Sequence, residues 1–139
     1  MKRRVRAVLI DKGIIVLLKR VKKHETYYVF PGGGVEGGEN LEEALRCEMK
    51  EELGVEIFIE KLLLEKQFEK DNLKQNEYFY LCKIIGGILG AGTGPEYKEG
   101  SNYEGIHEVV KIPVMEMKNL MAITANKNES RMPAAKKLI

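Results

Sequence analysis

Cysteine is scarce in this chain of 139 residues, which contains only Cys47 and Cys82. Two cysteines in a chain with no indication of secretion favour free thiols over a disulfide framework. Neither residue belongs to a C-x-x-C pair, so the sequence does not indicate a cysteine-based zinc site.

Long apolar runs are also missing, since no stretch approaches the roughly 18 residues of a membrane-spanning helix. The chain starts with basic residues, and Arg6 and Asp11 interrupt the apolar stretch that follows. This pattern argues against a cleavable signal peptide. We therefore expect a cytoplasmic protein with no membrane partner.

An excess of charge of one sign is absent, because 23 basic and 21 acidic residues leave a net charge of +2. This balance gives no indication of nucleic-acid binding. Basic residues do gather at Lys2–Arg6 and at Lys19–Lys23. We interpret both groups as solvated strand ends and a hairpin loop.

Several catalytic motifs are absent as well. The glycine-rich stretch Gly90–Gly94 is not followed by Gly-Lys-Ser/Thr, so it is not a phosphate-binding P-loop. His24 and His107 lie far apart and have no serine or cysteine motif beside them, so a hydrolytic triad is not indicated.

The order of the expected elements is mixed. Apolar and β-branched runs predict strands over Val5–Ile10, Ile14–Leu18, Tyr27–Phe30, Val55–Phe68 (bent or bulged), Tyr78–Ile85 and Ile106–Ile112. Polar or glycine-rich segments predict turns and loops over Lys19–Thr26, Asp71–Asn76 and Gly86–Gly94. Helices are expected over Leu41–Leu53 and Pro113–Met121, with a loose helix in the tail Thr124–Ile139. The pattern predicts one domain over residues 1–139 with an α/β fold of the α+β type.

The helix Leu41–Leu53 has clear signals at both ends. Asn40 is a favoured N-cap residue, and Glu43 follows three positions later as in a capping box. Gly54 fits the C-cap, where the backbone turns left-handed.

Acidic residues occupy the apolar stripe of this helix. On a wheel of about 100° per residue, Glu48 and Glu52 lie within about 20° of Leu41, and Glu51 lies on the edge of the stripe. A lone carboxylate at such a position is costly, and three at this spacing repel one another. A divalent cation would offset the repulsion. The glycines of the preceding segment Pro31–Gly34 would let the backbone approach a ligand closely.

The segment from Gly33 to Val55 reads GGVEGGENLEEALRCEMKEELGV and resembles the Nudix box, G-x5-E-x7-R-E-U-x-E-E-x-G-U, where U is apolar. The spacing fits over all 23 residues without a gap. The matching positions are Gly33, Glu39, Glu48, Met49, Glu51, Glu52, Gly54 and Val55. The resemblance implies the Nudix fold, a mixed β-sheet sandwiched between α-helices. It also implies hydrolysis of a nucleoside diphosphate linked to another group, such as a nucleoside triphosphate or a nucleotide sugar.

The resemblance further implies a metal ion, Mg²⁺ or alternatively Mn²⁺, which neutralises phosphate oxygens and activates water. Its ligands would be the carboxylates of Glu48, Glu51 and Glu52 and the carbonyl of Gly32. Glu48 or a glutamate of a later loop would accept the proton of the attacking water. The loop candidates are Glu96 first, then Glu77, Glu99 and Glu104.

Substrate binding is expected at further positions. We assign it to Gly33, Gly34 and Glu39 of the box and to Tyr28, a strand aromatic that could stack on a base or belong to the core. The side chains of Arg4, Arg6, Lys19 and Arg20 could bind phosphate, although a solvated surface is the simpler interpretation.

One box position departs from the family pattern, because Cys47 stands where the family has an arginine and Arg46 is its neighbour. In the family that arginine helps to hold the box glutamates, and a thiol cannot make a charge-assisted bond of that kind. The alternative function is therefore a Nudix-fold binding or regulatory domain with weakened catalysis. Isomerisation of an isoprenyl diphosphate is a remote third reading. Dimers are common among similar proteins, so a homodimer is one option.

Overall fold

Seven strands form one mixed sheet in the computed structural model, which describes residues 2–22, 24–90 and 106–117. The strands are β1 (Lys2–Asp11), β2 (Ile14–Lys22), β3 (Glu25–Val29), β4 (Gly32–Gly34), β5 (Val55–Lys70), β6 (Leu73–Gly87) and β7 (Ile106–Pro113). The helix α1 (Leu41–Leu53) and the 3-10 turn Val114–Glu116 complete the described elements. None of the helices in these three ranges is long and apolar enough to cross a membrane.

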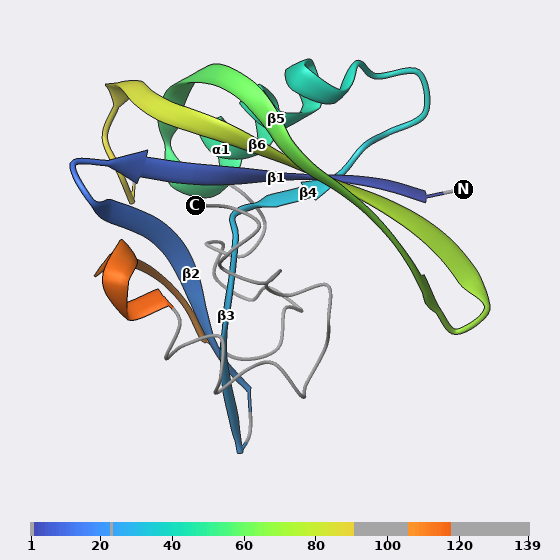
Figure 1. The fold of residues 1–139 in the computed structure, drawn as a ribbon, viewed down its shortest axis with the longest axis horizontal. Coiled ribbons are helices and arrows are strands. Elements are labelled where there is room, and N and C mark those ends of the chain that lie inside the picture. The colour runs from blue at the N-terminus through green and yellow to red at the C-terminus, as the bar shows by residue number, and fades with distance from the viewer. Residues whose placement is uncertain (1, 23, 91–105, 118–139) are drawn as a thin grey trace.

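Strand β1 occupies the middle of the sheet. The order is β3-β2-β1-β6-β5, with β4 paired to β1 and β7 paired to β2. Figure 1 shows β6 on one side of β1 and both β2 and β4 on the other. The β1–β6 pair is parallel and the remaining pairs are antiparallel. This arrangement sets the short glycine strand β4 directly beside the first half of β1.

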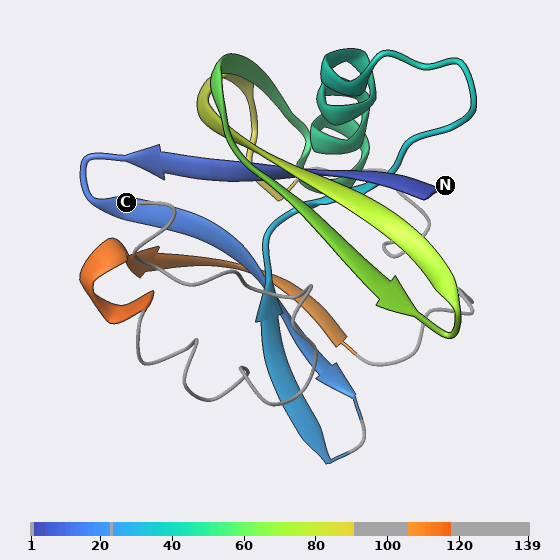
Figure 2. The same ribbon diagram turned by 45° about the vertical axis from the view of Figure 1, so that its right-hand side comes forward.

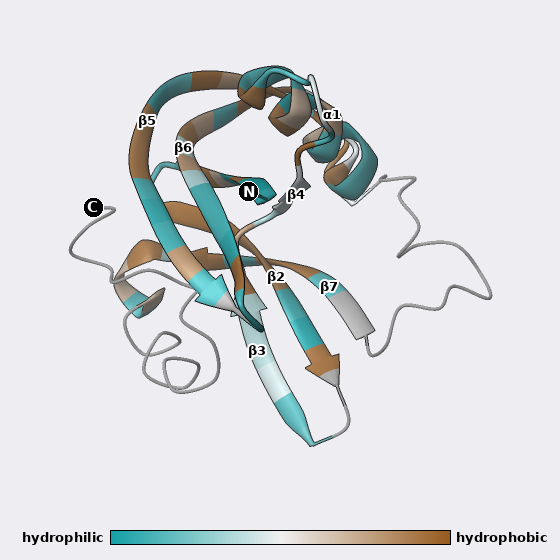
Figure 3. Cartoon of the chain, turned by 90° about the vertical axis from the view of Figure 1, so that its right-hand side faces the viewer, coloured by the Kyte–Doolittle hydropathy of each residue, from teal (hydrophilic) through white to brown (hydrophobic). Residues whose placement is uncertain are grey.

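Two apolar clusters pack on opposite faces of β1, because side chains alternate along a strand. Val5 and Ala7 join the cluster that α1 covers, and the helix lies against β1, β4 and β5 (Figure 2). Val8 joins the second cluster, which includes Phe79 and Met117. Far from α1, the β5–β6 hairpin becomes largely hydrophilic (Figure 3). The mixed sheet therefore has a helix on one face and a second apolar cluster on the other, as expected for an α+β protein.

The predicted helix and both of its caps are confirmed. The Asn40 side chain accepts hydrogen bonds from the backbone N–H groups of Glu42 (2.9 Å) and Glu43 (3.3 Å). Gly54 adopts φ 75°, and its N–H donates to the Lys50 carbonyl at 3.0 Å. Both ends are thus fixed by interactions between residues close in sequence, which is why the sequence locates them.

Two predicted turns are shorter than expected. Strand β2 continues to Lys22 and β3 begins at Glu25, so most of the polar stretch 19–26 is strand. The middle of this stretch pairs with two strands, since Arg20 lies opposite Tyr27 of β3 and also opposite His107 of β7. The predicted turn 71–76 is likewise only two residues, Asp71 and Asn72, both with positive φ as in a tight type I′ hairpin.

The remaining expectations have mixed outcomes. Strand β5 is irregular as predicted, with register shifts against β6 between Ile59 and Lys61 and between Leu62 and Leu64. The expected helix 113–121 begins as the 3-10 turn Val114–Glu116, and its residues after Met117 lie outside the described ranges. The expected tail helix 124–139 also lies outside them.

Candidate active site

Glu52 is the buried carboxylate of α1. Its side chain sits in the helix stripe that faces the sheet, and the residue is only 9% exposed. Its Oε1 accepts a hydrogen bond from the backbone N–H of Gly32 at 3.2 Å. The prediction that this acid lies in the apolar stripe is confirmed, and the contact ties the last turn of α1 to β4.

Glu48, one turn earlier, also lies against β4. A Cβ atom built on Gly33 would lie 2.6 Å from the Cδ of Glu48 and 2.7 Å from its Oε2. The carboxyl group therefore occupies the space that any larger residue at position 33 would need. Glu48 is partly buried, so α1 directs two carboxylates towards the same glycine strand.

Glu51 points to a different neighbour. The Cys47 Sγ donates a hydrogen bond to Glu51 Oε1 at 3.4 Å, and both residues are exposed. This hydrogen bond and burial raise the pKa of the Cys47 thiol. The residue in the place of the box arginine thus still contacts a box glutamate, but as a neutral donor.

The donor chemistry of this region suits a hard divalent cation, because Glu48 and Glu52 bring carboxylate oxygens close to the glycine strand β4. Within the described ranges, no three acidic, histidine or cysteine side chains are already grouped closely enough to hold a metal ion. Glu51 would have to leave Cys47 to join the other two acids.

The loop between β4 and α1 is organised by Glu39. Its Oε1 accepts from the N–H of Glu36 at 2.9 Å, and its carbonyl accepts from Arg3 Nη2 at 3.4 Å. The first contact lies within the loop, and the second attaches the loop to the start of β1. The substrate-binding role of Glu39 stays a prediction.

The box geometry agrees with the comparisons with known proteins. A sequence model of the NUDIX domain matches residues 1–130. The chain belongs to the NUDIX family. NUDIX hydrolases generally use divalent metal ions, and the oxygen donors described above are of the type those ions prefer.

The relatives of this NUDIX chain agree with the assignment. The 8-oxo-dGTP diphosphatase of Haemophilus influenzae is 37% identical over 71 residues, which is 51% of this chain and 50% of that protein. The match therefore spans about half the length of this curated relative.

Two solved structures share the fold. A NUDIX hydrolase from Nitrosomonas europaea superposes with a TM-score of 0.73 at 14% identity, covering 99% of this chain and 84% of that one. The E. coli ORF135 protein superposes with a TM-score of 0.63 at 21% identity, covering 96% and 95%.

The structure describes only some of the other predicted site residues of this NUDIX chain. Gly34 is exposed, and a Cβ atom there would meet nothing within 4 Å. Tyr28 is half-buried and packs against the second cluster. Three of the proposed loop bases, Glu96, Glu99 and Glu104, lie outside the described residues.

Glu77, the remaining candidate base, is not a solvated loop acid. It lies in β6 with a fully buried side chain, and its Oε2 is 3.7 Å from Arg6 Nε and 3.9 Å from Arg4 Nε. Burial raises the pKa of Glu77, against the opposing effect of Arg6 and Arg4. The interpretation of Arg6 as solvated is wrong, since its side chain is only 13% exposed, whereas the Arg4 side chain is partly exposed at 29%.

Sequence reasoning missed this Arg4–Glu77–Arg6 cluster. One signal was available, because Arg4 and Arg6 alternate with apolar Val5 and Ala7 in a strand rich in β-branched residues. Such alternation places both arginines on one face. That Glu77 lies beside them depends on the parallel pairing of β1 with β6, which the local sequence does not reveal.

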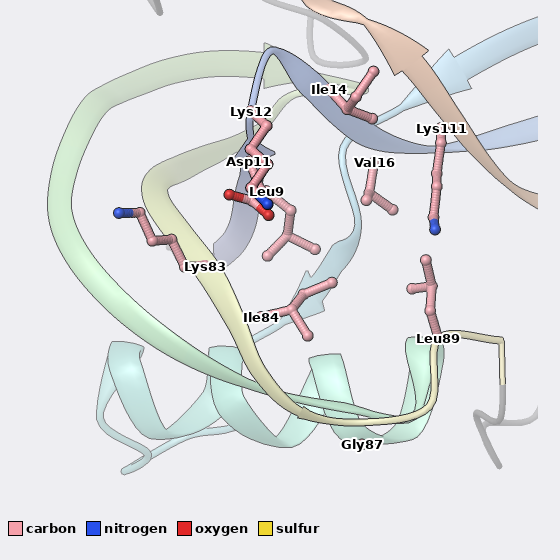
Figure 4. A pocket seen from close by; sticks show the side chains of 10 residues that line it. All are labelled: Leu9, Asp11, Lys12, Ile14, Val16, Lys83, Ile84, Gly87, Leu89 and Lys111. Carbon is pink, nitrogen blue, oxygen red and sulfur yellow. The ribbon is translucent and has the colours of Figure 1, made fainter.

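A separate cavity of about 510 Å³ lies at the β1–β2 turn and β6, and none of the predicted site residues lines it. Its apolar lining includes Leu9 and Val16, and Lys111 points towards Leu89 across it (Figure 4). Lys83 directs its ammonium group away from the cavity. This exposed hollow is therefore separate from the box carboxylates.

The two cysteines are expected to differ in reactivity. Burial raises the pKa of Cys82 to about 12, whereas Cys47 is exposed. Because the thiolate is the nucleophile, iodoacetamide at pH 8 should label Cys47 slowly and leave Cys82 unlabelled in the folded protein. Mass spectrometry of the peptides checks this, with the urea-unfolded protein, labelled at both thiols, as the control. Rapid native labelling of Cys82 would contradict the buried position.

Proposed function

We propose that this protein is a Mg²⁺-dependent hydrolase that cleaves the pyrophosphate linkage of a nucleoside diphosphate joined to another group. The observation that carries the proposal is the approach of Glu48 and Glu52 to the glycine strand β4, within a complete box spacing. Membership of the NUDIX family supports it. The substrate class remains a nucleotide, such as a nucleoside triphosphate or a nucleotide sugar.

Each residue of the site has a proposed role. Glu48, Glu51, Glu52 and the Gly32 carbonyl would hold the metal ion, which when bound lowers the charge on the diphosphate and acidifies a water molecule. The N–H of Gly32 holds Glu52 in position. The absence of a side chain at Gly33 leaves room for the Glu48 carboxylate.

The proton of the attacking water needs an acceptor, and we propose Glu48 or Glu96 for this role. Glu48 is partly buried beside the strand that the substrate would contact. Glu77 is a poor candidate, because its carboxyl is fully buried between two guanidinium groups. It is better suited to a structural role.

The alternative is a NUDIX-fold binding or regulatory domain with weakened catalysis. The hydrogen bond between Cys47 and Glu51 favours it, because a neutral thiol restrains Glu51 less strongly than a charged guanidinium would. The two other box carboxylates beside β4 favour the hydrolase.

A substrate panel tests the proposal. Purified protein is incubated with nucleoside triphosphates, an 8-oxo-dGTP sample, nucleotide sugars and dinucleoside polyphosphates, with Mg²⁺, with Mn²⁺, or with excess EDTA. We expect hydrolysis of at least one nucleotide with metal and none with EDTA. The released products, identified by chromatography, give the substrate class and the bond that is cleaved.

The outcome without turnover is also informative. If no substrate is hydrolysed with either metal, the Cys47→Arg variant is tested in the same panel. Activity in this variant would show that Cys47 is the cause of the inactivity of the wild type. If both proteins are inactive but still bind nucleotide in isothermal titration calorimetry, the result supports the alternative of a binding domain.

A further inference from the structure

We infer that Arg4 binds the diphosphate of the substrate and that Glu77 and Arg6 hold it in position for that task. This inference rests on the proposed function, and it adds a contact on the sheet to those of the box. The three residues come from β1 and β6, not from the box itself.

The strand register places Arg4 beside the site. In the β1–β4 pair, Arg4 lies opposite Gly34 and Arg6 opposite Gly32. The Arg4 side chain leaves β1 on the face opposite to Val5 and Ala7, and the three residues of β4 are all glycine, so no side chain of the neighbouring β4 stands beside it. A long guanidinium side chain can extend over such a strand.

Arg4 keeps most of its hydrogen-bonding capacity for a ligand. Among the described residues its guanidinium makes one ion pair, with Glu77 at 3.9 Å, and this distance is longer than a hydrogen bond. Arg6 differs, because its Nη1 donates to the Phe30 carbonyl at 3.0 Å and its side chain is more deeply buried. Arg4 is therefore the cation of the pair that can take an anion.

The charges of two box acids act on Arg4. Burial and the charge of Arg6 lower the pKa of Arg4, while Glu77, Glu48 and Glu52 raise it. An arginine remains protonated in this setting. The cluster of two guanidinium groups and one carboxylate thus carries a net positive charge next to a group of acids.

The buried Glu77 has a role in this arrangement. Neither of its side-chain oxygens has a hydrogen-bond partner among the described residues, although burying a carboxylate is costly. Its ion pairs with Arg4 and Arg6 of the neighbouring strand β1 offset part of that cost. A fixed guanidinium loses little freedom when it binds, and its planar fork matches two phosphate oxygens.

Equilibrium binding of inorganic pyrophosphate tests the inference. Isothermal titration calorimetry with Mg²⁺ compares the wild type with Arg4→Gln, Arg4→Lys and the control Lys61→Gln, which removes one exposed positive charge from the edge strand β5. We expect Arg4→Gln to weaken binding about tenfold or more and Lys61→Gln to match the wild type. Arg4→Lys should fall between them, because it keeps the charge and loses the bidentate contact.

Equal affinity of Arg4→Gln and the wild type would overturn the inference, as would absence of pyrophosphate binding to the wild type. Circular dichroism checks the fold, and if Arg4→Gln does not fold, Arg4→Lys decides: weaker binding than Lys61→Gln supports the inference, and equal binding overturns it. Failure of the proposed function is separate. Pyrophosphate binding that depends on Arg4, in a protein that hydrolyses no nucleotide, would retain the subsite and reject the hydrolase.

Discussion

The Glu52→Gln variant is expected to hydrolyse the nucleotide found in the substrate panel about 100-fold or more slowly than the wild type. Glutamine keeps the size of the side chain and can still accept the hydrogen bond from the Gly32 N–H. It removes the negative charge that a metal ion requires of this ligand. The kcat measured at saturating substrate and metal checks the prediction.

Glu42→Gln is the matched control for this experiment. Glu42 lies on the same helix but is exposed, and its ion pair with Arg46 at 3.8 Å is a surface contact. Such pairs contribute little to stability, so we expect wild-type activity and an unchanged melting temperature. Equal loss of activity in both variants would mean that any charge change on α1 damages the enzyme. Full activity of Glu52→Gln would remove Glu52 from the metal site.

The Gly33→Ala variant should lose about 100-fold in activity while the fold survives. The added methyl group would meet the Glu48 carboxyl group at 2.6 Å, a distance that real Cβ atoms do not tolerate. The far end of a glutamate can swing aside, so the clash moves the carboxylate and spares the backbone. A displacement of about 1 Å at a reacting group can cost roughly 10²-fold in rate. Steady-state kinetics and thermal melting of the variant check both parts.

Gly37→Ala serves as its control, because a Cβ atom at Gly37 would meet nothing within 4 Å. We expect this loop variant to retain activity. The free energy of unfolding of Gly33→Ala should change by less than about 1 kcal/mol, since alanine is compatible with an extended strand. A collapse of its melting temperature with unchanged activity per folded molecule would contradict the proposed contact with Glu48.

The bounds of helix α1 could be predicted from local sequence alone. Asn40, Gly54 and the spacing of the box acids are all read within one short segment, and the helix begins and ends where they predict. The hydrogen bonds that cap it join residues two to four positions apart. The box spacing was also enough to predict the family from the sequence alone.

The different exposure of the three box acids could not be predicted from this segment alone. A helix wheel places Glu48 and Glu52 in one stripe, yet only Glu52 is buried, Glu48 is partly buried and Glu51 turns to Cys47. The difference depends on where β4 runs past the helix. That path is set by pairing with β1, which is distant in sequence.

The sequence by itself therefore determined the helix, its caps, the positions of most strands along the chain and the NUDIX box. Only the tertiary structure decided that Arg4 and Arg6 both form ion pairs with the buried Glu77. Arg4 and Glu77 are more than 70 residues apart and meet because β1 and β6 pair in parallel. Local patterns reflect the contacts of neighbouring residues, whereas strand partners follow from the burial of the whole sheet, so no short segment can specify them.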